Sequence, residues 1–332
     1  MALPELLVCP GDLSVHAGGY SRAFRRRMFA GRTVSHILPY HSPDVSESDI
    51  DLFLENRKHF SLSGIQVKWS LIQEKNKLRL TRAGERGTHI LKPIPTGLKR
   101  VDQIPANEHV TMQIARQVFG ISTAENGLIF FKDGSPAFLT KRFDISSDGT
   151  KLRQEDFAAL ADRSALKDGP DFKYEYSYEE LADLLKRFVP AYTVEIEKYF
   201  RLILFNYLFS NGDAHLKNFS LLETPSSDFI LSPAYDLLDT RIHVSDSDFA
   251  LHKGLFSEPV GVASNHPDRK DFIRFGERVG IQPSRMEQLI HPFITRQDQV
   301  SDLVGRSFLD ESMQRGYILH YNTRRNFLNR AD

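Results

Sequence analysis

The chain has 332 residues, 41% of them hydrophobic and 26% charged, which is enough apolar material for one large or two ordinary folded domains. Its 43 basic and 43 acidic residues give zero net charge, which argues against a protein that binds nucleic acid mainly through a basic face. The single cysteine, Cys9, excludes a disulfide framework and a cysteine-based zinc site. No apolar run approaches the roughly 18 residues of a membrane span and no signal peptide is evident, so we expect a cytoplasmic protein without a membrane partner.

Residues 1–50 are predicted to form an extension that packs on the first folded domain. The sequence Cys-Pro-Gly-Asp at residues 9–12 is typical of a turn, and residues 34–38 are apolar enough for a short strand. Between them, Arg22 and three consecutive arginines at 25–27 form a basic cluster. Such a cluster is most often a solvated surface, and contact with nucleic acid or a partner is the alternative.

The alternation of residues 60–72 predicts a strand, a turn and a second strand. In a nucleotide-binding domain this turn would lie over the phosphates, with the backbone N–H groups of residues 63–66 and the ammonium of Lys68 facing negative charge. Gly64 is the only glycine of the turn, and serine-rich turns are common. On these residues alone, an ordinary hairpin is the simpler interpretation.

Lys92 ends a short strand predicted over residues 88–93. It alternates with Ile90, so its ammonium shares a face with an apolar side chain, which is costly unless the ammonium finds a partner. Two interpretations stay open: a buried lysine that holds nucleotide phosphates, as on strand β3 of protein kinases, and an edge lysine that extends into solvent.

Residues 107–119 are predicted to form a helix that Asn107 caps. Glu108, in the first turn of that helix, is the candidate partner of Lys92. Acidic residues are favoured at any helix start, so an ordinary helix-start residue is the alternative.

A hairpin about the Asp133-Gly134 turn is predicted from residues 127–131 and 136–143. Beyond about residue 145 the pattern becomes helical, with predicted helices at 155–160, 178–188, 195–209, 268–279, 284–295, 297–309 and 311–327. Residues 243–268 are polar and are predicted to form a solvated loop with a short strand.

A polar loop between an apolar helix and a buried strand is the most informative stretch. The breaker Asn211-Gly212-Asp213 follows the helix, and His215, Lys217 and Asn218 complete the loop before the strand at 219–222. Asp213 and Asn218 are five apart, which is the separation between the base and the magnesium-binding asparagine of protein kinases. A rigid loop of this kind is well suited to carry catalytic groups.

Asp236 follows a short apolar run and is the candidate second metal ligand, in the role of the aspartate in the kinase DFG motif. Mg²⁺ takes oxygen ligands and binds phosphates, usually through only one or two carboxylates. The alternative is that Asn-Gly-Asp is only a turn and that Asp236 caps the next segment.

These segments resemble the HipA-family kinases, the serine/threonine kinase toxins of bacterial toxin–antitoxin modules. The resemblance covers roughly residues 55–320. The matching motifs, in the order of the family, are SLSGIQVK at 61–68, HILKP at 89–93, NE at 107–108, KRFD at 141–144, NGDAHLKNFSLL at 211–222 and LSPAYDLLDT at 231–240.

The resemblance implies an α+β, two-lobed protein-kinase-like fold, with a β-rich N-lobe at residues 51–144 and a helical C-lobe at 145–332. It implies ATP and Mg²⁺ as cofactors. The extra N-terminal subdomain of long HipA proteins is expected to be absent, as in the compact HipT-like form, where the missing piece is a small separate protein.

The resemblance also implies a role for each matching residue. Asp213 would deprotonate a serine or threonine hydroxyl, and Asn218 and Asp236 would bind Mg²⁺. ATP would contact Ser63, Gly64, Ile65, Gln66, Lys68, Lys92, His215, Lys217 and Asn218, and the backbone of Lys141 and Phe143 would meet the adenine. The family often has an acidic residue where Lys141 stands, which matters little if main-chain groups make the contact. Ser61 and Ser63 are the candidate autophosphorylation sites.

The implied substrate is a translation component such as an aminoacyl-tRNA synthetase, and the implied partner is an antitoxin protein through which DNA is bound only indirectly. Two other classes stay open. A kinase of small-molecule hydroxyls is one, because no residue of the site names the acceptor. A nucleotide-binding regulator that works through an antitoxin is the other, although the intact set Asp213, Asn218 and Asp236 argues against it.

Overall fold

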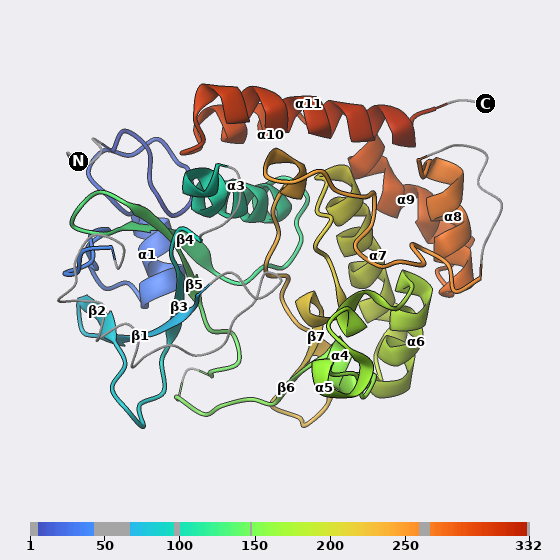
Figure 1. The fold of residues 1–332 in the computed structure, drawn as a ribbon, viewed down its shortest axis with the longest axis horizontal. Helices are drawn as coiled ribbons and strands as arrows, with labels where there is room; N and C mark the ends of the chain where they lie inside the picture. Colours follow the sequence, from blue (N-terminus) through green and yellow to red (C-terminus); the bar gives the residue numbers. More distant parts are fainter. Residues whose placement is uncertain (1–5, 43–66, 96–99, 147, 259–265, 331–332) are drawn as a thin grey trace. The chain divides into compact units, whose positions relative to one another are not determined.

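The computed structural model describes residues 6–42, 67–95, 100–146, 148–258 and 266–330 (Figure 1). The chain divides into two compact units. The first comprises Met1–Gln113, Ala124–Phe143 and Asp302–Gln314, and the second comprises Ile114–Thr123, Asp144–Ser301 and Arg315–Asp332. The first holds the larger sheet and the second holds most of the helices, while the domain limits expected near residues 50 and 144 stay predictions.

The first unit is built on a five-stranded antiparallel sheet in the order β2-β1-β3-β5-β4. Its strands are β1 (Trp69–Glu74), β2 (Lys77–Leu80), β3 (His89–Lys92), β4 (Asn126–Phe130) and β5 (Pro136–Lys141). The register pairs apolar side chains across the sheet, as in Trp69↔Leu91 and Leu91↔Leu139. Such cross-strand pairs stabilise a sheet because the facing side chains bury each other.

The predicted hairpin about Asp133 and Gly134 is confirmed as β4 and β5. Gly134 has a φ of 84°, a left-handed conformation that glycine adopts at little cost. Its N–H donates to the carbonyl oxygen of Phe131 at 2.9 Å and closes the turn.

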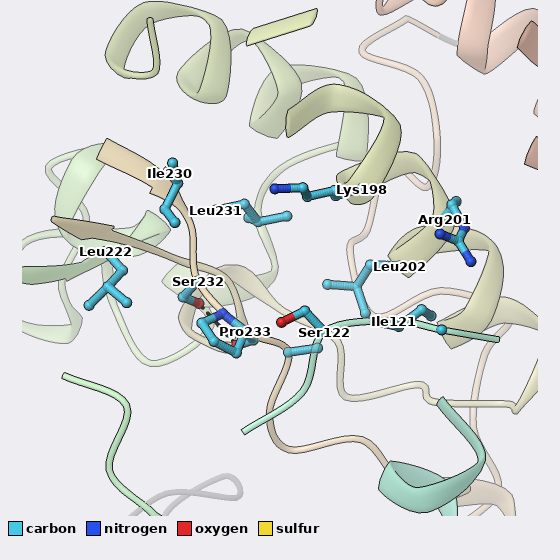
Figure 2. A pocket seen from close by; sticks show the side chains of 12 residues that line it. Ile121, Ser122, Lys198, Arg201, Leu202, Leu222, Ile230, Leu231, Ser232 and Pro233 are labelled. Carbon is cyan, nitrogen blue, oxygen red and sulfur yellow. Dashed lines mark hydrogen bonds between the residues drawn. The ribbon is translucent and has the colours of Figure 1, made fainter. Parts of the chain in front are cut away.

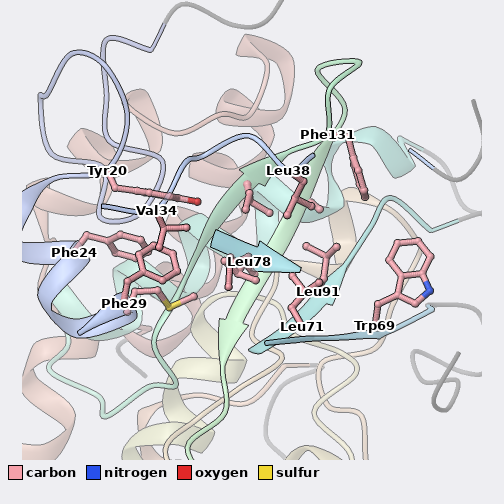
Figure 3. Packing of buried hydrophobic residues seen from close by; sticks show 14 of the residues in the cluster. Tyr20, Phe24, Phe29, Val34, Leu38, Trp69, Leu71, Leu78, Leu91 and Phe131 are labelled. Atoms are coloured by element: carbon pink, nitrogen blue, oxygen red, sulfur yellow. The ribbon is translucent and has the colours of Figure 1, made fainter. Parts of the chain in front are cut away.

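A helix in the N-terminal segment, α1 (Arg22–Phe29), was not predicted. Arginines occupy half of its eight positions and obscure the short apolar stripe in the sequence pattern. In the structure, the residues of this stripe, Phe24, Met28 and Phe29, are buried. These side chains join Val34, Leu71, Leu91 and other residues of the sheet in one hydrophobic cluster (Figure 3). Burying each large apolar side chain is worth about 1.5–3 kcal/mol, so this stripe determines how the helix packs.

The strand predicted at residues 34–38 is wrong, because the structure has only an isolated bridge between Ile37 and Phe130. The N–H of Leu38 donates to the carbonyl oxygen of Phe130 at 2.8 Å, and the N–H of Phe130 donates to the carbonyl oxygen of His36 at 2.8 Å. Pro39 follows directly and has no N–H with which to continue a ladder.

The helix expected to begin after Asn107 begins earlier. α3 (Ile104–Gln117) follows the short 3-10 helix η1 (Val101–Gln103), and Pro105 suits its first turn because an N–H there would lack a helical partner. Asn107 is therefore not the cap. It is buried within the helix, where its carbonyl oxygen accepts a hydrogen bond from Thr111 Oγ1 at 2.9 Å.

The second unit combines helices with a three-stranded antiparallel sheet in the order β6-β7-β8. Its strands are β6 (Gln154–Asp156), β7 (Ser220–Glu223) and β8 (Phe229–Leu231). The helices are α4 (Phe157–Leu160), α5 (Ala165–Asp168), α6 (Tyr178–Phe188), α7 (Tyr192–Leu208), α8 (Arg269–Arg278), α9 (Pro283–Ile294), α10 (Asp298–Gly305) and α11 (Glu311–Leu328), the last two shared with the first unit. Among the described residues, none of the helices is long and apolar enough to cross a bilayer.

The helices expected at 178–188, 195–209, 268–279, 284–295 and 311–327 are confirmed, and the one expected at 297–309 ends earlier, at Gly305. α6 begins with a capping box, in which the side chain of Ser177 accepts from the Glu180 N–H and the Glu180 side chain accepts from the Ser177 N–H. α7 buries most of its 17 residues, which identifies it as a core helix. The helix expected at 155–160 is only partly right, because residues up to Asp156 form β6.

The expectation of a solvated loop with a short strand at 243–268 is wrong for the described part of that segment. Residues 243–258 and 266–268 contain no strand, and Leu251 and Leu255 are buried. The carbonyl oxygens of Gly254 and Leu255 accept from the N–H groups of Tyr178 and Glu179 at 3.0 Å each. The loop thus satisfies N–H groups at the start of α6 that have no partner within the helix.

Candidate active site

The loop between α7 and β7 carries four of the predicted site residues. At its start, the ring of Phe209 stacks on those of Phe205 and Tyr321, with centroids 4.4 and 5.3 Å away. At its end, the 3-10 helix η3 (Leu216–Asn218) leads into the buried strand β7. Core elements thus hold the loop at both ends, which allows it to position reactive groups accurately.

Close packing requires a glycine next to Asp213. A Cβ atom on Gly212 would lie 2.1 Å from Oδ2 of Asp246. The Gly212 N–H donates to Oγ1 of Thr240 at 2.9 Å, and that hydroxyl lies 2.7 Å from the same carboxylate oxygen of Asp246. The Asn-Gly-Asp sequence is therefore built into the core of this unit and is more than an exposed turn.

Asp213 carries the carboxyl group of this loop, and its pKa is strongly perturbed. Its side chain is 13% exposed, and Tyr174 Oη donates to its Oδ1 at 3.1 Å. Burial raises the pKa of Asp213 to about 6, Lys173 opposes that rise, and Asp236 and Asp246 add to it. A carboxylate whose pKa lies close to neutral pH is well suited to accept a proton.

His215 is held beside Asp213 in its neutral form. The Nζ of Lys173 lies 2.9 Å from Nε2 of His215, so the lysine donates and that nitrogen accepts. Burial and the charge of Lys173 lower the pKa of His215 to about 3. The proton therefore sits on Nδ1, a buried atom without a hydrogen-bond partner among the described residues.

Asn218 presents an amide oxygen on the same loop. Its Nδ2 donates to the backbone carbonyl oxygen of Asp213 at 3.1 Å. Within the described ranges, no hydrogen-bond donor reaches its Oδ1. The bond fixes the amide and leaves one oxygen for a ligand.

Asp236 lies on the segment after β8, and the backbone there is in an unusual conformation. Its φ is 56°, in the left-handed region that non-glycine residues adopt at some cost. Its carboxyl is near enough to Asp213 to raise the pKa of that residue. The structure thus brings Asp213, Asn218 and Asp236 together within the second unit.

Asn211 links the loop to the segment of Asp236. Its Nδ2 donates to the carbonyl oxygen of Asp236 at 3.4 Å and to Oδ1 of Asn206 at 3.0 Å. Its own Oδ1 accepts from the N–H of Asp213 at 3.3 Å. One buried amide therefore determines the relative position of the two acidic residues.

In the first unit, the structure pairs Lys92 with Glu108. The Nζ of Lys92 lies 2.5 Å from Oε1 of Glu108, and each side chain is 2% exposed. Lys92 is therefore not an edge lysine that extends into solvent. Glu108 lies within α3 and not at its start, so the helix-start alternative is also wrong.

The other predicted residues occupy varied positions. Lys68 is half-buried just before β1, and Lys217 is exposed. Lys141 ends β5, where its N–H donates to the carbonyl oxygen of Glu125 at 2.8 Å, and Phe143 follows half-buried. Ser61, Ser63, Gly64, Ile65 and Gln66 lie outside the described residues.

Sequence reasoning missed Lys173 and Tyr174, which lie in the 3-10 helix η2 (Phe172–Tyr174). They contact His215 and Asp213 from about 40 positions upstream, with separations of 42 and 39 residues. No local pattern indicates such a contact. Asn211 was recognised only as part of a breaker, although a buried amide next to a candidate base could have suggested a positioning role.

Two of the solved structures that match the fold are informative. One is a chain of the Shewanella oneidensis MR-1 complex of the HipA toxin, the HipB antitoxin and operator DNA, with a TM-score of 0.64 at 20% identity over 86% of this chain and 72% of that one. The other is the Helicobacter pylori proinflammatory kinase CtkA, with a TM-score of 0.50 at 13% identity over 79% of this chain and 90% of that one. The expected α+β, protein-kinase-like fold is thereby confirmed.

The family follows from the sequence comparisons. The HipA-like C-terminal domain matches residues 60–300. A protein of Haemophilus influenzae with a provisional kinase name is 27% identical over 282 residues, which are 77% of this chain and 78% of that protein. The serine/threonine-protein kinase toxin HipA of Shewanella oneidensis is 24% identical over 210 residues, 57% of this chain but only 45% of the toxin. The chain belongs to the HipA family and is kinase-like, as the resemblance implied.

Proposed function

We propose that this chain is an ATP- and Mg²⁺-dependent serine/threonine protein kinase that acts as the toxin of a toxin–antitoxin module. The observation that carries the proposal is the buried carboxyl of Asp213, whose pKa is raised to about 6 beside an asparagine with an unused amide oxygen. Such a carboxylate can take a proton near neutral pH, which a protein kinase requires of its catalytic aspartate.

In the proposed reaction, the oxygen of a serine or threonine hydroxyl forms a bond to the γ-phosphorus of ATP. The bond from that phosphorus to the bridging oxygen breaks, and ADP leaves. Asp213 accepts the hydroxyl proton. Lys173, paired to His215, supplies a buried positive charge next to this carboxyl, where it opposes the accumulation of negative charge.

The donor set around Asp213 fits Mg²⁺. Asn218 offers an amide oxygen and Asp236 a carboxylate, both of which suit a hard cation that keeps few protein ligands. When bound, Mg²⁺ would offset the charge of the phosphates. His215 would donate through its buried Nδ1 to the nucleotide, and Lys217 would reach it from the exposed side of the loop.

We assign the rest of the nucleotide contacts to the first unit. Lys92, fixed by Glu108, would pair with phosphate oxygens. The backbone of residues 63–66 and Lys68 would add further phosphate contacts, and the backbone of Lys141 and Phe143 would contact the adenine. Ser61 and Ser63 would be the sites of autophosphorylation, which would place negative charge near the phosphates and inhibit ATP binding.

We propose an aminoacyl-tRNA synthetase as the class of substrate, and an antitoxin, with a small separate N-subdomain-like protein, as partners in the cytoplasm. DNA would be reached only through the antitoxin. The Shewanella HipA structure, in which that toxin is solved together with HipB and operator DNA, supports the antitoxin as partner.

The test compares the purified protein with Asp213→Asn in a bacterial lysate supplied with radiolabelled ATP. We expect the wild type to label a discrete protein band and Asp213→Asn to label it at least ~10³-fold more slowly. Asp228→Asn, on the exposed turn after β7, is the matched control and should retain full activity. Equal labelling by Asp213→Asn would refute the assignment, and label found only in small molecules would favour a small-molecule kinase.

A second measurement addresses autophosphorylation. Mass spectrometry of the peptide spanning residues 60–68 should show one added phosphate on Ser61 or Ser63 after incubation with ATP. The Asp213→Asn protein should show none. An unmodified peptide from an active enzyme would exclude this part of the proposal.

A further inference from the structure

The second unit contains a pocket of about 310 Å³ that none of the predicted site residues lines (Figure 2). Its walls come from α7, from β7 and β8, and from residues 120–122 after α3. The volume lies at the lower end of the range of pockets that hold small molecules, about 300–1,000 Å³. The pocket is therefore large enough for a ligand such as a two-ring aromatic compound.

One wall of the pocket is apolar. Leu202 of α7, Leu222 of β7, and Ile230 and Leu231 of β8 contribute aliphatic side chains. Figure 2 shows these side chains around one space, with the hydroxyl of Ser122 directed toward it. An apolar wall with a few polar groups is the usual composition of a ligand site.

Lys198 and Arg201 of α7 add positive charge to the pocket. Lys198 is neutralised, because its Nζ lies 2.5 Å from Oε1 of the buried Glu195. The other carboxylate oxygen of Glu195 accepts from the N–H of Leu231 at 3.1 Å, which fixes this ion pair against β8. Lys198 therefore shapes the wall and contributes little net charge.

Arg201 is different, because no carboxylate among the described residues pairs with it. The side chain is half-buried, and its NH2 group donates to the backbone carbonyl of Phe119, which carries no charge. Glu197, one helical turn away, is engaged by Arg285 at 3.0 and 2.9 Å. Burial lowers the pKa of the Arg201 guanidinium, and the charge of Glu197 offsets that fall only in part, because its carboxylate is bonded to Arg285.

We propose that this pocket binds a small amphipathic anion, whose apolar body lies against Leu202, Ile230 and Leu231 and whose carboxylate or phosphate pairs with Arg201. A guanidinium forms two parallel hydrogen bonds to either head group, so the geometry fits both. The apolar wall excludes a compact inorganic ion as the best ligand, because such an ion would leave the wall without a partner.

The position of the pocket suggests what its ligand does. Ala234 lines the pocket, and its N–H donates to the carbonyl oxygen of Ser122 at 2.8 Å. Asp236 follows two residues later, so a ligand that restrains this segment restrains the predicted metal ligand. This consequence rests on the proposed function, whereas binding itself does not.

Isothermal titration calorimetry of the full chain tests the site with four compounds: naphthoate, naphthyl phosphate, naphthalenemethanol and acetate. We expect the two naphthyl anions to bind with one-to-one stoichiometry. The neutral alcohol and acetate should each bind at least ~10-fold more weakly, because one lacks the charge and the other the apolar body. The tighter of the two anions identifies the preferred head group.

Two variants locate the binding. Arg201→Met keeps the aliphatic stem but removes the charge, and Ser122→Leu fills the pocket, so each should weaken naphthoate binding at least ~10-fold. Arg187→Met, on the exposed surface of α6, removes one positive charge elsewhere and should leave binding unchanged. Thermal unfolding verifies that each variant is folded. If only one of Arg201→Met and Ser122→Leu folds, that variant is sufficient to locate the binding.

The proposed site would be refuted if both pocket variants bound naphthoate as tightly as the wild type. It would also be refuted if naphthalenemethanol bound with the same affinity as naphthoate. Binding that ATP displaces but the variants do not affect would belong to the nucleotide site and would overturn it equally. A ligand that binds as expected yet leaves the Mg²⁺ dependence of kinase activity unchanged would refute the link to Asp236. Failure of the kinase proposal would leave the calorimetric result unaffected.

Discussion

The two units each bury a cluster of charged side chains, and the clusters differ in how completely their charges are paired. In the first unit, Lys92 and Glu108 form a close ion pair of opposite charges, both almost fully buried. In the second unit, burial raises the pKa of Asp213 to about 6 although Lys173 lies nearby. His215 there has a buried Nδ1 without a partner among the described residues.

The difference separates a structural pair from a site that needs a ligand. A buried ion pair with good geometry is complete, and its main contribution is to fix the position of the lysine. The cluster in the second unit keeps Asp236 in a strained backbone conformation, the Nδ1–H of His215 without an acceptor among the described residues, and the amide oxygen of Asn218 unused. Such a cluster is incomplete without another molecule. Proteins tolerate such costs mainly at functional sites.

The largest effect is expected from Asp236→Asn. Asparagine tolerates the left-handed backbone of this position, so the change removes the charge and keeps the chain conformation. We expect the initial rate of phosphorylation to fall about 10³-fold, equivalent to about 4 kcal/mol of transition-state stabilisation. The rate is measured as a function of Mg²⁺ concentration. Wild-type activity at every Mg²⁺ concentration would remove Asp236 from the site.

The complete pair should be costly to break from one side. Glu108→Gln removes the carboxylate that lies against the buried ammonium of Lys92, and we expect it to lower the free energy of unfolding by about 3–5 kcal/mol. The double variant Lys92→Met, Glu108→Leu should recover most of that loss, because apolar side chains need no partner. Urea unfolding measures both. A double variant as unstable as Glu108→Gln would show that the loss of stability does not come from the uncompensated charge of Lys92.

The incomplete cluster should respond in the opposite direction. The pKa of Asp213 rises from 3.8 to about 6 on folding, so the folded state binds the proton more tightly than the unfolded state. The resulting stability is present below the unfolded pKa and is lost as the pH rises through about 6. Asp213→Asn should therefore stabilise the protein by on the order of 1–2 kcal/mol near pH 8, and by almost nothing near pH 3.

Urea unfolding at both pH values checks this sign, and Asp228→Asn on the exposed turn provides the control. A destabilised Asp213→Asn near pH 8 would mean that the carboxylate is satisfied inside the fold. The two clusters would then be alike, and the comparison would fail.

Periodic patterns predicted most of the fold, and they failed where the pattern was short. α6 and α11 were predicted almost to the residue because their apolar stripes run over several turns. α1 was missed because its arginines dominate eight residues. The start of α3 was misplaced because Asn107 looks like a cap, although Pro105 indicated an earlier start.

The site was predictable only where it is local. Asp213 and Asn218 share one loop, so their spacing was informative, and Asp236 follows on a nearby segment. Lys173 and Tyr174 reach the same site from a different part of the chain through tertiary folding. A single sequence shows no signal for such a contact, because the intervening residues do not determine which segments meet.

Lys173 shows whether the cluster in the second unit works as one system. Its ammonium opposes the rise in the pKa of Asp213 and contributes to the fall in the pKa of His215. Lys173→Met keeps the aliphatic stem and removes the charge. The pKa of Asp213 should then rise further, so that less of it is ionised at neutral pH. We expect about a tenfold lower rate at pH 7, with the acid limb of the pH–rate profile displaced to higher pH.

The direction of that displacement distinguishes an electrostatic role from a structural one. Lys173→Arg keeps the charge and should return the acid limb toward its wild-type position, and Lys167→Met on α5 should change neither rate nor profile. A lower rate with an undisplaced limb would mean that Lys173 acts on the substrate or on the local fold and leaves the proton affinity of Asp213 unchanged. His215 should stay neutral in every variant, because burial is the larger cause of its low pKa.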